Sequence, residues 1–134
     1  MTNSYFPPDE FIQLLSSNLR TLIQAYPSTN RWISSVLGKV IGVEASNIVV
    51  ANGASELISS ISGTLINNMA IPVPTFEEYT NRVKALGKQI SPFLLTGDFH
   101  LDTQEFISHI HASGANSVVI VNPNNPTGTL TQRD

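Results

Sequence analysis

Two short segments of the sequence carry residue types that are suited to binding a ligand. The first, Gly53-Ala54-Ser55, combines small residues with a hydroxyl where a β-branched run gives way to a helical pattern. Free backbone amides at a helix start, together with the helix dipole, attract anions, so this turn suits a phosphate. The alternative is an ordinary tight turn in which Ser55 caps the helix.

The second segment, residues 122–128, reads Asn-Pro-Asn-Asn-Pro-Thr-Gly and directly follows an apolar run. Its prolines restrict the backbone, and an asparagine held in this way can donate a hydrogen bond to a phenolate-type oxygen. Asn-Pro and Pro-Thr-Gly are also common turn formers. A run of this length and order nevertheless favours a binding role over a generic turn.

Residues 53–57 also allow a hypothesis from another class, a serine hydrolase that uses Ser55. A G-x-S-x-G turn between a strand and a helix carries the nucleophile of such enzymes, but Leu57 stands where the second glycine belongs. Acids and histidines further along would complete the order Ser, Asp, His: Asp98 or Asp102, then His109 or His111. The two histidines are two positions apart on a predicted helix, so they cannot share a metal, and we expect them to be solvated.

Composition narrows the classes of protein. The chain has 134 residues, 41% of them hydrophobic and 13% charged, with no cysteine and a net charge of -3. This length is sufficient for one compact domain, and the lack of cysteine excludes disulfides, thiol catalysis and cysteine-ligated zinc. The charge balance argues against nucleic acid or an anionic membrane as a partner. Because no stretch can span a bilayer and no secretory signal is evident, we expect a cytoplasmic protein.

Helical and strand-like patterns alternate along the chain. Apolar residues at the helical period predict helices over residues 9–26, 30–41, 54–65, 75–86 and 102–110. Apolar or β-branched runs predict buried strands at residues 47–51, 69–73 and 117–121, and a strand at 89–95 whose Pro92 favours an edge position. Thr75 with Glu78, and Asp102 with Glu105, fit capping boxes at two helix starts.

This order predicts an α/β fold of three layers, in which a mainly parallel sheet carries helices on both faces. Ligands of such sheets bind where strands end and helices begin. Both ligand-binding turns follow a predicted strand, after Ala51 and after Val121. They are therefore expected at the same edge of the sheet.

The turn at 122–128, N-P-N-N-P-T-G, resembles the signature of the class I/II aminotransferases, the fold-type I pyridoxal-phosphate (PLP) enzymes. Residues 47–57, N-I-V-V-A-N-G-A-S-E-L, resemble the family's cofactor-phosphate turn, and residues 74–79, P-T-F-E-E-Y, its ring-stacking segment. Tyr26-Pro27 also falls in the family's order. The spacing is most similar to histidinol-phosphate aminotransferases and threonine-phosphate decarboxylases.

The resemblance implies a role for five residues toward PLP. Ala54 and Ser55 would hold the cofactor phosphate, Phe76 would stack on the pyridine ring, and Asn125 would bond the ring oxygen. Tyr26 would reach the phosphate in the neighbouring subunit, which implies a homodimer. Phe76 and Tyr26 also fit the apolar stripes of their predicted helices, and the alternative for both is a core position. A cis bond between Asn125 and Pro126 is implied as well.

The same resemblance places the Schiff-base lysine beyond residue 134. The lysines present are Lys39, Lys84 and Lys88, and none lies in the family's lysine motif. We therefore expect an N-terminal helical segment at residues 1–27 and a truncated PLP-binding domain at 28–134, inactive alone and without a catalytic or metal-binding residue. The closing residues 131–134 resemble a helix start.

The expected function is that of an aminotransferase fragment acting on an amino acid or an amino-phosphate. Three alternatives stay open: a PLP-dependent decarboxylase of the same family, the serine hydrolase, and a non-catalytic phosphate-binding α/β fragment.

Overall fold

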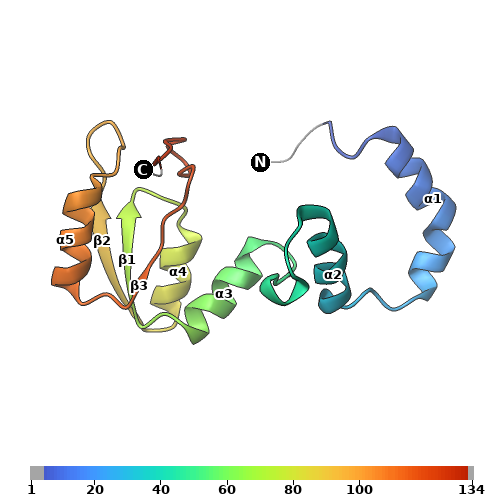
Figure 1. The fold of residues 1–134 in the computed structure, drawn as a ribbon, viewed down its shortest axis with the longest axis horizontal. Coiled ribbons are helices and arrows are strands. Elements are labelled where there is room, and N and C mark those ends of the chain that lie inside the picture. Colours follow the sequence, from blue (N-terminus) through green and yellow to red (C-terminus); the bar gives the residue numbers. More distant parts are fainter. Residues whose placement is uncertain (1–4, 133–134) are drawn as a thin grey trace. The chain divides into compact units, whose positions relative to one another are not determined.

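The computed structural model describes residues 5–132 and falls into two compact units, residues 1–50 and 51–134 (Figure 1). The boundary expected after residue 27 lies inside the first unit. The helix start expected at residues 131–134 lies partly outside the described residues. In the part of the chain that is described, no helix is both long enough and apolar enough to cross a bilayer.

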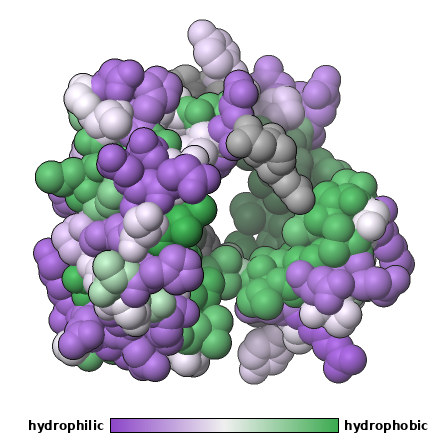
Figure 2. Space-filling view, turned by 60° about the vertical axis from the view of Figure 1, so that its left-hand side comes forward, coloured by the Kyte–Doolittle hydropathy of each residue, from purple (hydrophilic) through white to green (hydrophobic). Residues whose placement is uncertain are grey.

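The first unit is helical. Helix α1 (Asp9–Gln24) begins after Pro8 with two acids in its first turn, where they face the positive end of the helix dipole. It has no buried residue, and its apolar side chains lie at the surface. Apolar side chains are visible at the surface in Figure 2, in green. The apolar stripe of α1 therefore forms no core within the described part of this unit.

Helix α2 (Asn30–Ile41) has the bounds that the sequence predicts. The Thr29 hydroxyl accepts a hydrogen bond from the Trp32 amide at 3.2 Å, which caps the helix start. Gly42 ends the helix in the left-handed conformation, with φ of 71°. A residue with a side chain would be strained there, so this glycine has a conformational reason.

The strand predicted at residues 47–51 is wrong. A short 3-10 helix (Ala45–Asn47) is followed by extended backbone without a neighbouring strand among the described residues. Side chains of α2 take the carbonyl groups that a sheet would have used: Asn30 Nδ2 donates to Val50 O at 2.9 Å, and Ser34 Oγ donates to Ile48 O at 3.1 Å. The β-branched pattern reports a segment that packs on a helix rather than in a sheet.

The backbone that follows α2 lies close to Gly38, and this closeness predicts the effect of a substitution there. Gly38 is buried, and a Cβ built there would overlap the Val43 carbonyl oxygen. We expect Gly38→Ala to lower the free energy of unfolding by about 1–3 kcal/mol, because the backbone of α2 and that of Val43 must move apart to make room for the methyl group. Urea unfolding followed by the fluorescence of Trp32, on the same helix, measures this.

Gly63→Ala is the matched control, because Gly63 also lies within a helix but has open space around its Cα. That change should stabilise its helix by up to about 1 kcal/mol. Equal behaviour of the two variants would contradict the steric explanation.

The second unit contains a three-stranded parallel sheet. Helix α3 (Ala54–Thr64) leads into β1 (Asn68–Val73), followed by α4 (Glu78–Ala85), β2 (Gln89–Leu94), α5 (Thr103–Ser113) and β3 (Ser117–Val118). The strand order is β2-β1-β3, with Asn68 opposite Gln89 and Met69 opposite Ser117. The buried strand predicted at residues 69–73 is thus confirmed, and it lies at the centre of this sheet, while β2, with Pro92, lies at its edge as predicted.

Strand β3 is shorter than the predicted 117–121. The amide of Val119 still donates to Ala70 O at 3.0 Å. In that register the next bond would run from the amide of residue 72 to the carbonyl of Val119. Residue 72 is a proline and has no amide hydrogen, so the ladder stops there.

Helices α4 and α5 lie on opposite sides of the sheet, so the predicted three-layer α/β arrangement is present (Figure 1). On the α4 side, Val83 packs with Met69 and Ile71, and all three are fully buried. On the α5 side, Phe106 and Phe93 pack with ring centroids 5.2 Å apart. Because both faces of β1 are covered, its sequence reads as a continuous apolar run.

The two predicted capping boxes have different outcomes. Asp102 caps α5 as expected, since its carboxylate accepts from the Glu105 amide at 2.9 Å. The box at Thr75 is wrong: α4 begins only at Glu78, and the Thr75 hydroxyl bonds a distant residue instead. Residues 74–77 therefore form a turn between β1 and α4.

Candidate functional site

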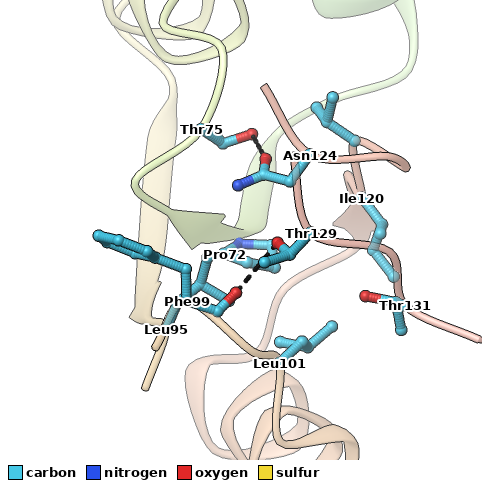
Figure 3. A pocket seen from close by; sticks show the side chains of 10 residues that line it. Pro72, Thr75, Leu95, Phe99, Leu101, Ile120, Asn124, Thr129 and Thr131 are labelled. Atoms are coloured by element: carbon cyan, nitrogen blue, oxygen red, sulfur yellow. Dashed lines mark hydrogen bonds between the residues drawn. The ribbon is translucent and has the colours of Figure 1, made fainter. Parts of the chain in front are cut away.

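The segments that follow the three strands are joined by hydrogen bonds at the carboxyl edge of the sheet (Figure 3). After β1, the Thr75 hydroxyl donates to Asn124 Oδ1 at 2.7 Å. After β2, the Phe99 carbonyl accepts from the Thr129 hydroxyl at 3.1 Å. The turn after β3 thus bonds both of the other segments. Sequence reasoning missed Thr75 and Thr129 because each of their partners lies far along the chain.

The turn after β3, residues 122–131, is closed by its own backbone. Asn124 N–H donates to Thr129 O at 2.8 Å, and Gly128 N–H donates to Asn124 O at 2.7 Å. At its base, Asn122 Nδ2 donates to Thr131 O at 2.8 Å and Asn122 Oδ1 accepts from Thr131 N–H at 3.0 Å. The bonds Asn122–Pro123 and Asn125–Pro126 are both cis, and the second confirms the prediction.

The three asparagines of this turn differ in what remains available. The amides of Asn122 and Asn124 are used within the protein. Asn125 is exposed, and over residues 5–132 its side-chain amide has no hydrogen-bond partner. Of the three, Asn125 is therefore the one that can donate to a ligand.

Phe76 lies in the turn between β1 and α4, not within the helix. Its side chain is 38% exposed, and its ring meets the ring of Tyr79 edge-to-face with centroids 6.3 Å apart. Because α4 begins only at Glu78, Phe76 does not belong to the apolar stripe of that helix and does not lie in the core. A partly exposed aromatic ring at this edge can stack on a planar ligand.

The Gly53-Ala54-Ser55 turn starts helix α3. Gly53 is the N-cap, with φ of 81°, and has no side chain to cap the helix. Glu56 folds back so that its carboxylate accepts from Asn52 N–H at 2.8 Å. The amides of Ala54 and Ser55 and the Ser55 hydroxyl have no partner in the described chain. These donors stand at the positive end of the helix dipole, as an anion site requires.

No hydrogen bond joins this turn to Phe76 or Asn125 within the described residues. Helix α3 packs on α4 and runs obliquely to β1, so its first turn lies away from the carboxyl edge of the sheet (Figure 1). The expectation that both ligand-binding turns lie at one edge of the sheet is therefore wrong for the Ser55 turn, because the segment before it is not a strand of this sheet. Tyr26 belongs to the helical unit, where its side chain is 99% exposed.

A small cavity lies beneath the turn after β3 and is drawn in Figure 3. Its walls include Pro72, Thr75, Ile120 and Asn124, and its volume is about 20 Å³. That volume is enough for about one water molecule. The cavity is therefore a small gap in the packing beneath the turn and is too small for an organic cofactor.

The residues of the serine hydrolase hypothesis are engaged elsewhere. Asp102 caps α5, and Asp98 accepts from the Thr96 hydroxyl, which lowers the pKa of Asp98 below its usual value. His109 is half-buried against β2, with Nε2 3.3 Å from Ser91 O and its ring 5.5 Å from that of Phe93. The prediction that His109 is solvated is wrong, because α5 turns this side chain toward the sheet. None of these groups bonds Ser55 in the described part of the chain.

Lys88 has a structural position. Its Nζ donates to Ser62 O at 2.6 Å and to Gly63 O at 2.8 Å, at the carboxyl end of α3. A cation there satisfies carbonyl groups that lack partners and opposes the helix dipole. Lys39 and Lys84 are exposed on α2 and α4.

Removal of this cation should therefore destabilise the second unit. We expect Lys88→Met to lower the free energy of unfolding by about 1–2 kcal/mol, since two charge-assisted hydrogen bonds are lost. Urea unfolding followed by circular dichroism measures the change. Lys84→Met removes the same charge from an exposed position without such bonds, and should change stability by less than about 0.5 kcal/mol. Equal effects would show that net charge, not the cap, matters.

The parallel sheet with a helix on each face, together with the similarity to solved structures, defines a fragment of a fold-type I PLP enzyme. Residues 15–134 match the family model described as aminotransferase class I and II. The chain belongs to the aminotransferase class I and II family, whose cofactor is pyridoxal 5′-phosphate.

Individual relatives agree with this assignment. The chain is 32% identical to the histidinol-phosphate aminotransferase of Thermoanaerobacter sp., over 95% of this chain and 38% of that protein. It is 29% identical to an L-serine phosphate decarboxylase of Campylobacter jejuni, over 82% of this chain and 29% of that protein. The solved histidinol-phosphate aminotransferase of Clostridium acetobutylicum superposes with a TM-score of 0.74 at 30% identity, covering 89% of this chain and 35% of that one. The chain spans only 20–40% of the length of the curated relatives it matches.

Proposed function

We propose that this chain forms the part of a PLP-dependent aminotransferase that holds the cofactor's phosphate and one side of its ring, the substrate being an amino acid or an amino-phosphate. One observation carries the proposal: groups suited to each part of PLP remain available in the described residues. The amides of Ala54, Ser55 and Asn125 have no hydrogen-bond partner there, and the ring of Phe76 is partly exposed. When bound, PLP supplies an electron sink for chemistry at the substrate's amino carbon.

The phosphate would be held at the start of α3. Two backbone amides and the Ser55 hydroxyl point into solvent there, and the Gly53 position leaves room for close approach. Glu56 does not occupy these amides, because its carboxylate accepts from the Asn52 amide instead. A helix start with free donors is the standard arrangement for phosphate recognition.

The ring would be positioned by the two turns after β1 and β3. Phe76 offers an aromatic face, and stacking there contributes about 0.5–1.5 kcal/mol beyond the burial of area. Asn125 would donate from Nδ2 to the oxygen on the ring. Both side chains come from turns that are bonded to each other through Thr75 and Asn124.

Catalysis would need a lysine that these residues do not supply. Lys88 is bonded at the end of α3, and Lys39 and Lys84 lie on the surfaces of their helices. We therefore infer that residues 1–134 alone bind PLP reversibly and do not transfer amino groups. Borohydride reduction with PLP, followed by peptide mapping, should show no single lysine labelled in stoichiometric yield; such labelling, or turnover, would overturn this inference.

The decisive experiment uses pyridoxine 5′-phosphate, which keeps the ring, its oxygen and the phosphate but has no aldehyde to react with surface lysines. Calorimetric titration should show saturable binding at least about tenfold tighter than that of pyridoxine, because the phosphate uses charge-assisted hydrogen bonds. Equal affinities would overturn the proposal. Affinity for inorganic phosphate as high as for pyridoxine 5′-phosphate would instead support a non-catalytic phosphate-binding fragment.

A homodimer belongs to the same proposal. Support comes from Tyr26, which is 99% exposed, and from the apolar stripe of α1, which no described residue of its own unit buries. An apolar surface of this kind favours association. Sedimentation at increasing protein concentration should show a monomer–dimer equilibrium, and a monomer at all concentrations would contradict it.

A PLP-dependent decarboxylase is the second candidate. The observation that favours it is the similarity to the L-serine phosphate decarboxylase of Campylobacter jejuni. Both activities would use the same phosphate and ring contacts. In an enzyme that joins these residues to a segment supplying the lysine, release of the substrate carboxylate as CO2, without formation of a keto acid, would identify the decarboxylase.

A further inference from the structure

We propose that Asn124 is a positioning residue that holds the Phe76 turn and Asn125 in one fixed arrangement, through a directed chain of hydrogen bonds. This inference rests on the proposed function, because it concerns how the two ring contacts of that site are kept together. Asn124 itself has no side-chain donor left for a ligand.

The side chain of Asn124 uses both ends of its amide. Its oxygen accepts from the Thr75 hydroxyl at 2.7 Å. Its nitrogen donates one hydrogen to Pro74 O at 2.9 Å and the other to Thr127 Oγ1 at 2.8 Å. Two of these bonds hold residues 74 and 75, immediately before Phe76, and the third lies within the turn that carries Asn125.

The hydroxyl hydrogens beyond Asn124 can be assigned by elimination. Thr129 donates to Phe99 O at 3.1 Å, so its hydrogen is used. The 2.8 Å contact between Thr127 Oγ1 and Thr129 Oγ1 must then be donated by Thr127. The bonds run in one direction, from Asn124 through Thr127 and Thr129 to the segment after β2. One side chain thereby orders segments that follow all three strands.

Only an amide satisfies position 124. A carboxylate has the same shape but no hydrogens, so it would face the Pro74 carbonyl without a donor and would draw the Thr127 hydrogen away from Thr129. Thr75 is buried and Asn124 is half-buried, so a lost partner there is not fully replaced by water.

The turn offers a matched control. Asn122 is an asparagine of the same turn, and its side-chain amide is also bonded at both its oxygen and its nitrogen, but to Thr131 at the base of the turn. It is exposed and makes no bond to the Phe76 turn. Asn122→Asp and Asn124→Asp therefore make the same chemical change in one turn, and only the second acts on the coupling.

The first test is amide hydrogen exchange of the protein without ligand. Asn124→Asp should raise exchange at least about tenfold both at Asn81, whose amide donates to Glu77 O in the Phe76 turn at 2.8 Å, and at Gly128, whose amide donates to Asn124 O. Asn122→Asp should leave Asn81 unchanged. Thr75→Val, which removes one hydroxyl, should raise exchange at Gly128, and Thr75→Ser, which keeps it, should not. Because an aspartic acid regains a donor when protonated, lowering the pH toward about 4 should partly restore Asn124→Asp relative to Asn122→Asp. If Asn124→Asp leaves Asn81 at the exchange rate of the parent protein, the proposal is overturned.

The second test is calorimetric binding of pyridoxine 5′-phosphate. Asn124→Asp and Thr75→Val should each weaken binding about tenfold, while Asn122→Asp and Thr75→Ser should weaken it less than about twofold. Normal affinity in both of the first two variants would overturn the positioning role even if exchange had changed. If the parent protein binds no pyridoxine 5′-phosphate, the proposed function fails, and the exchange results still decide whether Asn124 couples the two turns.

Discussion

Replacement of Asn125 by aspartate should weaken the binding of pyridoxine 5′-phosphate by about 10–100-fold without lowering the stability of the protein. The amide of Asn125 is the uncommitted donor of its turn, and a carboxylate there would place a negative charge against the ring oxygen. A hydrogen bond to a charged group contributes about 1.5–3 kcal/mol, and each 1.4 kcal/mol is a tenfold change in affinity. Calorimetry measures the affinity, and urea unfolding measures the stability.

Asn125→Ala separates the two causes, since it removes the donor without adding a charge. Its loss of affinity should be about tenfold, smaller than that of the aspartate variant. Because Asn125 makes no hydrogen bond within the described protein, both variants should unfold at the urea concentration of the parent. Unchanged affinity in both would remove Asn125 from the site, and a large loss of stability would show that its role is structural.

A second large effect is expected at the start of α3, where Ala54→Pro and Ser55→Ala remove different donors. Proline fits the first position of a helix, so Ala54→Pro deletes one amide hydrogen while the helix is kept. Ser55→Ala deletes the hydroxyl. Each variant should weaken the binding of pyridoxine 5′-phosphate by about tenfold or more, because each removes a charge-assisted bond to phosphate.

Pyridoxine, which has no phosphate, is the control ligand, and neither variant should change its affinity by more than about twofold. Ser59→Ala is the control variant, because Ser59 is exposed on the same helix one turn further along. If Ser55→Ala weakens the two ligands equally, the start of α3 does not contact the phosphate, and the phosphate site must lie elsewhere.

Local patterns predicted the elements that local interactions decide. Helix α2 has the predicted bounds because the residues that end it, the N-cap Thr29 and the C-cap Gly42, are its immediate neighbours in the sequence. Strand β1 was predictable because a strand covered on both faces needs consecutive apolar residues. The same patterns were wrong at residues 47–51, where α2 supplies the hydrogen-bond partners, and at β3, where Pro72 of a neighbouring strand ends the ladder.

For the candidate site, the sequence by itself determined which groups exist: the small-residue turn at Ser55, the aromatic Phe76 and the asparagine run. These depend on residue types in adjacent positions, and such order is visible along the chain. Only the tertiary structure decided which groups are available. The Thr75 hydroxyl bonds Asn124, 49 positions away, instead of capping a helix. The side chains of Asn122 and Asn124 are hydrogen-bonded within the protein, whereas that of Asn125 is not. The physical reason is that a hydrogen-bond donor serves whichever acceptor the fold brings within about 3 Å, and sequence distance does not enter that choice.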